Sequence, residues 1–322
     1  MAADADTTAE HRTPPMLYGV LVTYRRPQAL EHYLDVLAQQ SKRIDHLFVV
    51  DNAPSTVTRD VIARGQKAGS AHQITHLEMA MNLGPAGGFA EGLRAVMAVA
   101  DDDAWVVMLD DDDPPPWDDM LERVFEFACS QYRRDRRVAM AGRVGARFDY
   151  RVGRTVRLRD EQLAGTVDVD YVAGNQFPTV RVAAVRDVGP YRDELFFGFE
   201  ELEFGLRLRA RGYRIVIDGE FSLAARARVN RLGGGFGRPR LTQGAPAWRR
   251  YYSVRNLIVI LRDHGSWPAA LLVTFTAVAK TAVLVVRDPG SAREHTTSVA
   301  LAVADGWRGR VGRRLEPPVT DR

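Results

Sequence analysis

The chain of 322 residues has a formal net charge of +3, and 46% of its residues are apolar. These values are ordinary for a soluble globular protein and allow one large α/β domain with an appendage, while the single cysteine excludes an internal disulfide. From residue 226 onward, 17 Lys/Arg against 6 Asp/Glu give a net charge of +11, whereas the preceding residues carry −8. This basic quarter predicts an anionic partner, and nucleic acid is the least favoured one because aromatic residues do not alternate with the basic ones.

We expect residues 1–15 to be disordered, because they are polar and acidic and lack the apolar stretch of a secretory signal. Strand and helix patterns then alternate along the first half of the chain. Apolar runs predict strands at 17–23, 46–50, 74–78 and 105–109, and helical spacing of apolar residues predicts helices over 30–37, 87–100 and 117–132. This order predicts an α/β fold with a mostly parallel, Rossmann-like sheet flanked by helices. The polar residues that end the first, second and fourth strands should therefore converge on one ligand site.

Four consecutive aspartates, residues 110–113, follow the apolar strand at 105–109. Carboxylates this close repel one another, and a divalent cation such as Mg²⁺ or Mn²⁺ relieves the repulsion. The alternative is an acidic helix cap, since aspartate is favoured before a helix and three prolines lead into the helix predicted at 117–132. The cluster taken alone leaves both interpretations open.

Glutamates gather at the start of a helix predicted over 200–211, which Gly212 ends. Glu200 and Glu203 would share one face, with Glu201 turned about 100° away. Glutamates in a first helical turn are also favoured by the helix dipole alone. Between the two acidic clusters, residues 82–89 form a glycine-rich turn into a helix, which predicts either an anion site or an ordinary strand-to-helix turn.

The second half is less regular, with strands predicted at 167–172 and 214–217 and a flexible loop at 231–239. Two closing helices are predicted at 248–263 and 268–286, followed by a basic tail. The second of these helices contains one charge, Lys280, and a lysine within a bilayer span costs about 2.5–3.5 kcal/mol. We therefore expect a buried core helix or a helix in the membrane interface rather than a span.

Six motifs follow one another along the chain: Thr23-Tyr24-Arg25-Arg26-Pro27, Val50-Asp51-Asn52, Asn82-Leu83-Gly84 through Gly88, Asp110 to Asp113, Phe197 to Arg207 with Gly212-Tyr213, and Tyr251-Tyr252-x-x-Arg255-Asn256. In these motifs and their order, over roughly residues 17–263, the chain resembles the family 2 inverting glycosyltransferases, which have the GT-A fold. Within the family, the motifs at residues 82–89 and 200–207 are most similar to those of actinobacterial galactofuranosyltransferases. Rhamnosyltransferases that build polyprenyl-linked cell-wall glycans are close behind.

The resemblance implies a GT-A domain over 16–230, a loop and helices on the acceptor or membrane side over 231–290, and a basic tail over 291–322. It implies that Asp110 and Asp112 hold Mn²⁺ or Mg²⁺ against the donor diphosphate, and that Glu201 is the catalytic base. The residues implied to bind the donor are Thr23, Tyr24, Arg25, Asp51, Asn82, Gly84, Gly87 and Asp111. Among these, Asp51 would take the nucleobase end.

The sequence departs from the family pattern at two positions. The family usually has aspartate where this chain has Glu201, so Glu200 is a rival base. The histidine that galactofuranosyltransferases supply as a metal ligand is absent from residues 221–228, and Arg226 or Arg228 could provide a fixed cation near the phosphates instead. Glu203 and Arg255 could line the acceptor or diphosphate pocket, with simple packing of a helix as the alternative for Arg255.

The resulting prediction is a metal-dependent inverting glycosyltransferase with a UDP- or dTDP-sugar donor, galactofuranose or rhamnose being favoured. Its predicted acceptor is a polyprenyl-diphosphate-linked glycan, and its predicted location is the cytoplasm, peripheral to the inner face of the cell membrane. One alternative is a catalytically degenerate protein that binds a nucleotide sugar or glycan. A nucleotidyltransferase is less favoured, because the loop after the first strand is not rich in glycine.

Overall fold

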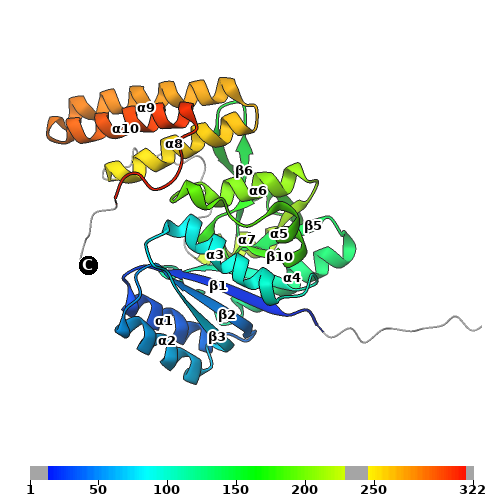
Figure 1. The fold of residues 1–322 in the computed structure, drawn as a ribbon. Coiled ribbons are helices and arrows are strands. Elements are labelled where there is room, and N and C mark those ends of the chain that lie inside the picture. Colours follow the sequence, from blue (N-terminus) through cyan, green and yellow to red (C-terminus); the bar gives the residue numbers. More distant parts are fainter. Residues whose placement is uncertain (1–13, 229–245, 317–322) are drawn as a thin grey trace, which may run out of the picture.

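The computed structural model describes residues 14–228 and 246–316 (Figure 1). Its centre is an eight-stranded sheet with the strand order β3-β2-β1-β4-β10-β5-β11-β8. The strands are β1 (Leu17–Thr23), β2 (Ile44–Asp51), β3 (Ala71–Glu78), β4 (Trp105–Asp110), β5 (Val138–Gly142), β8 (Thr166–Val169), β10 (Thr179–Arg181) and β11 (Arg214–Asp218). The pairs within β3-β2-β1-β4 and the pair β5-β11 are parallel, whereas β10 and β8 are antiparallel to their neighbours. The sheet is mixed but mostly parallel, which confirms the predicted fold class.

Side chains alternate between the two faces of the sheet along each strand. Both faces therefore carry apolar residues, and helices cover both. Val20 and Val22 of β1 belong to a core that includes Phe89, whereas Leu21 belongs to a second core that includes Leu34. The first core contains residues of α3 (Gly84–Val99), α5 (Val182–Val188) and α6 (Glu200–Ala210), and the second contains residues of α1 (Pro27–Ala38), α2 (Thr56–Ala68) and α4 (Met120–Arg134). All seven residues of β1 are buried, as the apolar run predicted.

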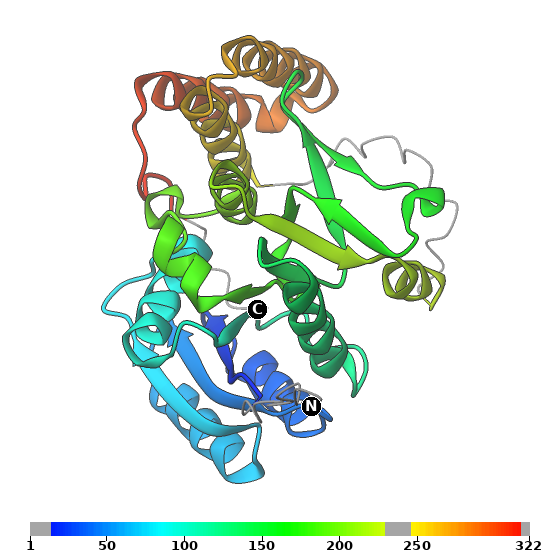
Figure 2. The same ribbon diagram turned by 90° about the vertical axis from the view of Figure 1, so that its right-hand side faces the viewer.

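The single strand predicted at 167–172 is wrong, because the structure divides it between two sheets. β8 pairs with β11 in the main sheet, whereas β9 (Tyr171–Val172) joins β6 (Gly145–Asp149) and β7 (Arg154–Arg157) in a small antiparallel sheet. Asp170 lies between the two pieces, where its carboxylate accepts the Phe148 N–H at 2.7 Å. The small sheet reaches toward the C-terminal helices, and Phe148 packs in one core with Leu261 and Ala269 (Figure 2).

Three helices form a bundle at the end of the molecule away from α1 and α2 (Figure 1). α8 (Ala247–Asp263) and α9 (Trp267–Arg287) confirm the two predicted closing helices. The segment predicted as a basic tail contains a third helix, α10 (Ala292–Arg308), which buries Val299 and Ala302. The predicted loop at 231–239 and most of the predicted disordered N-terminus lie outside the described residues.

α9 is the one helix of the described residues that is long and apolar enough to cross a membrane, judged by length and composition only. The most apolar 18-residue window of this 21-residue helix has a mean hydropathy of 2.1, and 22% of the window is buried inside the protein. A core helix of a soluble protein can pass the same test. The role of α9 must therefore be judged from how the helix packs against the rest of the protein.

Candidate functional site

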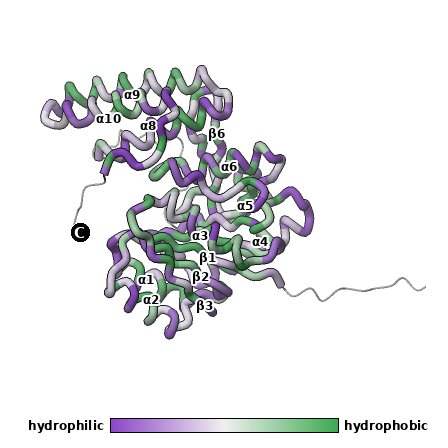
Figure 3. The backbone as a smooth tube through the Cα atoms, in the orientation of Figure 1, coloured by the Kyte–Doolittle hydropathy of each residue, from purple (hydrophilic) through white to green (hydrophobic). Residues whose placement is uncertain are grey.

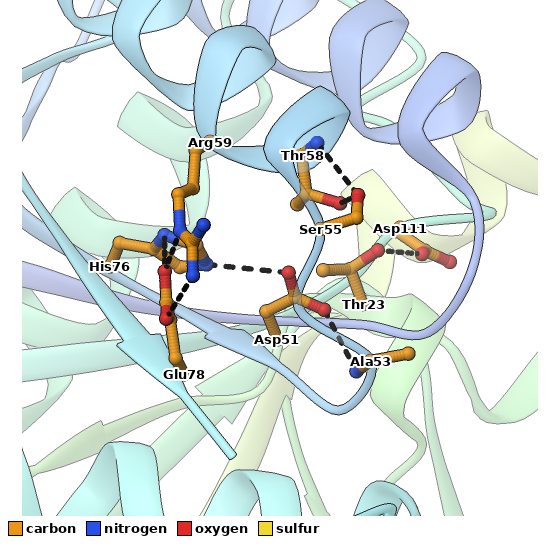
Figure 4. A network of polar contacts seen from close by, with 9 residues as sticks. All are labelled: Thr23, Asp51, Ala53, Ser55, Thr58, Arg59, His76, Glu78 and Asp111. Carbon is orange, nitrogen blue, oxygen red and sulfur yellow. Dashed lines mark hydrogen bonds and ion pairs between the residues drawn. The ribbon is translucent and has the colours of Figure 1, made fainter. Parts of the chain in front are cut away.

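Polar residues meet at the carboxyl edge of the parallel strands. Thr23 is paired with Asp51 across β1 and β2, and Val22 is paired with Asp110 across β1 and β4. The hydroxyl of Thr23 also donates to Oδ2 of Asp111 at 2.6 Å, between two buried side chains. The predicted convergence of the three strand ends is therefore confirmed (Figure 4).

Asp110, Asp111 and Asp112 form an acidic triad in which one carboxylate oxygen of each lies within 4.8 Å of the others. Burial raises the pKa of Asp110 to about 7, and the charges of Asp112, Asp111 and Glu201 add to this effect. Burial also raises the pKa of Asp111, although the Thr23 hydrogen bond and Arg26 oppose the shift. The helix-cap alternative does not hold, because α4 begins only at Met120 and its N-cap residue is Asp119.

A positively charged side chain, that of Arg26, lies at the acidic triad. Nη1 of Arg26 is 2.9 Å from Oδ2 of Asp112 and 3.5 Å from Oδ1 of Asp111. Arg25, the residue predicted from the same motif, instead extends its guanidinium over the Tyr24 ring at 5.3 Å. Arg25 has a positive φ of 56°, and this turn of the backbone separates the two arginines. The motif showed that arginines were present but could not show which one faces the carboxylates.

Asp51 is buried, and its carboxylate is held from two sides. Oδ1 accepts the Ala53 N–H at 2.9 Å, and Oδ2 lies 3.3 Å from Nε2 of His76 (Figure 4). Nδ1 of His76 lies 3.4 Å from Oε1 of Glu78, which in turn pairs with Arg59. Spacing along the sequence does not predict this contact of His76, because the contact depends on the pairing of β2 with β3.

The glycine-rich turn at the start of α3 makes mainly structural contacts. Oδ1 of Asn82 accepts the Gly84 N–H at 2.8 Å, and Gly84 has a φ of +69°. A Cβ at Gly84 would lie 2.1 Å from the carbonyl oxygen of Phe196, and one at Gly87 would lie 2.6 Å from Cβ of Leu83. The turn is thus packed tightly against the segment that leads into α6.

Glu200 and Glu201 begin α6, after Phe199 with a positive φ of 69°. Oε1 of Glu201 accepts the Gly174 N–H at 2.9 Å, and this side chain is only partly buried. Glu200 is 5% exposed, and its Oε2 has no hydrogen-bond partner among the described residues. Burial raises the pKa of both carboxyls, far more for Glu200, to which the charges of Glu201 and Asp110 also contribute. The two glutamates therefore lie within electrostatic reach of the acidic triad.

Glu203 and the three predicted arginines have partners within the protein. Glu203 pairs with Nε of Arg207 at 2.8 Å. Arg226, on α7 (Gly219–Arg228), pairs with Asp160 at 2.7 Å, and Arg228 lies over the Trp117 ring at 4.8 Å. Neither contact involves the triad.

Arg255 is 0% exposed, and it donates to the carbonyl oxygens of Leu195 at 2.8 Å and Gly312 at 2.6 Å. This environment favours the packing alternative for Arg255 over a place in a ligand pocket.

Residues 20–158 match the profile of Glycosyl transferase family 2. This stretch, which is less than half of the chain, is similar to a glycosyltransferase family 2 domain. It is 41% identical over 92 residues to galactofuranosyltransferase GlfT1 of Mycobacterium tuberculosis and 40% identical over 88 residues to the protein of that name from Mycolicibacterium smegmatis. These alignments cover 28% and 27% of this chain and 29% and 28% of the relatives, so the chain matches less than a third of each relative's length.

Two solved structures are similar to this chain in fold. Mannosyltransferase PcManGT from Pyrobaculum calidifontis, solved with GDP-Man and Mn²⁺, has a TM-score of 0.50 at 16% identity, over 92% of this chain and 88% of that one. GalNAc-T7, solved with UDP, GalNAc and Mn²⁺, has a TM-score of 0.53 at 11% identity, over 77% of this chain and 48% of that one. They support the GT-A fold. The family match ends at residue 158, so Glu200 and Glu201 lie beyond it.

Proposed function

We propose that the protein is a metal-dependent inverting glycosyltransferase that moves a sugar from a nucleotide-sugar donor to a glycan acceptor. The observation that carries the proposal is the proximity of the acidic triad to the start of α6, where the charge of Glu201 raises the pKa of Asp110. A transfer reaction needs a place for the diphosphate and a base for the acceptor hydroxyl. The two acidic clusters supply one candidate for each.

The donor atoms of the triad fit a hard divalent cation. Asp110 and Asp112 would hold Mn²⁺ or Mg²⁺, because carboxylate oxygens are the ligands these ions prefer, and the raised pKa of Asp110 reports repulsion and burial that a cation would relieve. When bound, the ion neutralises charge on the leaving nucleoside diphosphate. PcManGT and GalNAc-T7, which were both solved with Mn²⁺, support this assignment.

Glu201 is the proposed base. The Gly174 N–H fixes its Oε1, and the carboxylate takes the proton of the acceptor hydroxyl as that oxygen attacks the anomeric carbon. The new glycosidic bond forms on the face opposite the departing diphosphate, so the bond to the diphosphate breaks with inversion. A base in this position contributes about 10²–10⁴-fold to the rate.

The name of the GlfT1 relatives favours galactofuranose as the sugar, with rhamnose as the second choice. For the acceptor we propose a glycan linked to polyprenyl diphosphate, reached by a peripheral protein at the inner face of the cell membrane. The net charge of +11 from residue 226 onward supports a location at an anionic surface. Asp51, with Thr23 beside it, is the proposed contact for the nucleobase end of the donor.

Isothermal titration tests the proposal, with UDP-galactofuranose, UDP-galactose, UDP-glucose and dTDP-rhamnose as ligands, each with and without Mn²⁺. We expect one donor to bind only with Mn²⁺, and this binding to be lost in Asp112→Ala. Asp113→Ala is the matched control, because Asp113 is the next residue but lies outside the triad. Metal-independent binding in every case would contradict the metal site, and binding without transfer would favour a degenerate sugar-binding protein.

A further inference from the structure

One face of α9 is apolar and uncovered. Its large exposed side chains are Trp267, Leu271, Leu272, Phe275, Val278, Val283 and Val286, with Phe275 71% and Val286 82% exposed. At about 100° per residue, these positions fall within one half of the helix circumference. The residues therefore form a continuous stripe, which we call the α9 face. Isolated apolar side chains are normal on a protein surface, but a contiguous stripe of this length is not.

The opposite side of α9 is anchored in the bundle. Ala270 and Val273 are buried in the core that contains Ile258 and Leu261 of α8, and the indole N–H of Trp307 on α10 donates to the Thr274 hydroxyl at 3.0 Å. α9 thus lies lengthwise against two helices at the outer end of the molecule, away from the sheet (Figure 1). Apolar segments of α9 at this outer edge are evident in Figure 3. A helix held along its whole length in this way suits the plane of a membrane rather than a span across it.

The net charge of the bundle favours a lipid surface over a second copy of the chain as the partner of the α9 face. The bundle, residues 246–316, carries eleven Lys/Arg and five Asp/Glu, a net of +6, and Lys280, Arg287 and Arg293 are exposed on α9 and α10. A second copy seated on the same face would bring two basic bundles together, which like-charge repulsion opposes. An anionic lipid surface complements the bundle, because long basic side chains reach headgroups while apolar side chains enter the acyl boundary.

We propose that the α9 face docks on an anionic lipid bilayer with the helix axis parallel to the membrane plane. Phe275, Val278 and Leu271 enter the interface, and Lys280 and Arg287 contact lipid headgroups. The inference deepens the proposed function, on which it rests for the membrane-bound acceptor, by assigning the surface that contacts lipid. The assignment of the α9 face as this surface rests on the exposure of its side chains and on the charge of the bundle.

Flotation of the full-length protein with lipid vesicles tests the surface. We expect binding to phosphatidylcholine vesicles that contain phosphatidylglycerol, weaker binding at high salt, and still weaker binding to phosphatidylcholine alone. Val278→Asp should reduce binding about tenfold or more, because a charge must enter the apolar boundary. Val57→Asp is a closely matched control, since Val57 and Val278 are both 53% exposed and Val57 lies on α2 at the other end of the molecule.

Three results would overturn the inference: equal vesicle binding by wild type and Val278→Asp, equal binding to neutral and anionic vesicles, or a wild-type dimer in sedimentation that Phe275→Asp dissociates. Circular dichroism checks that each variant is folded. If Phe275→Asp is unfolded, Phe275→Ser takes its place. Donor titration on the same variants separates this surface from the proposed function. If the wild type binds vesicles but no donor, the α9 face is still a lipid-binding surface, and the proposed function is contradicted.

Discussion

Glu200 and Glu201 are adjacent in the sequence, yet the structure gives them different surroundings. Glu201 accepts an N–H from Gly174, whereas Oε2 of Glu200 is buried and has no partner among the described residues. Burial raises the pKa of both carboxyls, and two backbone N–H groups oppose the shift in each, but the charges of Glu201 and Asp110 raise the pKa of Glu200 further, to well above its ordinary value. Glu201 therefore ionises first as the pH rises, which favours it over Glu200 as the base.

The first prediction concerns the pH dependence of turnover. Glu201 must be ionised to accept a proton, so kcat should fall as the pH is lowered through its raised pKa. Glu201→Gln should lower kcat about 10²–10⁴-fold and abolish this acid limb. Glu200→Gln is the matched control and should retain the limb. The opposite pattern in the two pH–rate profiles would make Glu200 the base.

The same burial predicts a pH-dependent effect on stability. Because the pKa of Glu200 is higher in the folded protein than in the unfolded chain, the folded protein binds more protons between the two values. Stability therefore falls as the pH rises through that window. Glu200→Gln should be more stable than wild type at neutral pH and lose the gain at acidic pH, as measured by urea unfolding. An equal gain at both pH values, or the same gain in exposed Glu126→Gln, would contradict this account.

Arg26 competes with a cation for Asp112. Its guanidinium lies 2.9 Å from the Asp112 carboxylate, so removing it should free a ligand and remove a positive charge from the triad. We expect Arg26→Ala to bind Mn²⁺ several-fold more tightly in the absence of donor, measured by electron paramagnetic resonance. Arg25→Ala, which removes a neighbouring arginine directed at Tyr24, should change the affinity less. Equal affinities in the three proteins would show that Arg26 does not compete.

Among the elements, the turn into α3 is joined to the segment before α6. The Phe196 carbonyl accepts the Ala86 N–H at 3.3 Å and leaves no room for a side chain at Gly84. Gly84→Ala should therefore lower the free energy of unfolding by at least about 1–3 kcal/mol and disturb the start of α6. Gly212→Ala separates clash from backbone strain, since Gly212 has a φ of +85° but would have no atom within 4 Å of its Cβ. Similar losses for both variants in urea unfolding would rule out the clash.

The regular elements of the first half could be predicted from the sequence because each depends on local pattern. β1 is a continuous apolar run, and α1 buries Leu30, Tyr33, Leu34 and Leu37 at helical spacing. The division of 167–172 could not be predicted, since it depends on the hydrogen bond from Phe148 to Asp170 across the small sheet. Asp110 and Asp112 were predictable from their density of charge, whereas the positions of Arg26 and His76 depend on distant parts of the chain.

At the scale of the whole molecule, the C-terminal bundle holds the segment that carries the glutamates. Nδ2 of Asn256 donates to the carbonyl oxygens of Leu195, Phe197 and Gly198, and Arg255 donates to Leu195. This segment contains two phenylalanines with positive φ, Phe196 at 63° and Phe199 at 69°. Such conformations cost about 1–3 kcal/mol each and persist where surrounding contacts hold them.

Arg255→Met should therefore lower the free energy of unfolding by about 3 kcal/mol or more, because it removes several buried hydrogen bonds from a charged donor. Turnover should fall more than donor affinity, since the triad lies at the end of β4, whereas the glutamates directly follow the segment that loosens. Arg308→Met, at another exposed arginine of the bundle on α10, is the control. Urea unfolding and donor titration measure the two effects, and an unchanged stability would exclude this role for Arg255.

The α9 face has a consequence for encounter with the substrate. For a protein docked through this helix, the search for a lipid-linked acceptor takes place in two dimensions, and the bilayer acts as a tether that sets the local concentration of both reactants. The rate then follows the number of acceptor molecules per unit area of membrane rather than the number per unit volume of solution. Adding inert lipid dilutes the acceptor on the surface while leaving its bulk concentration unchanged.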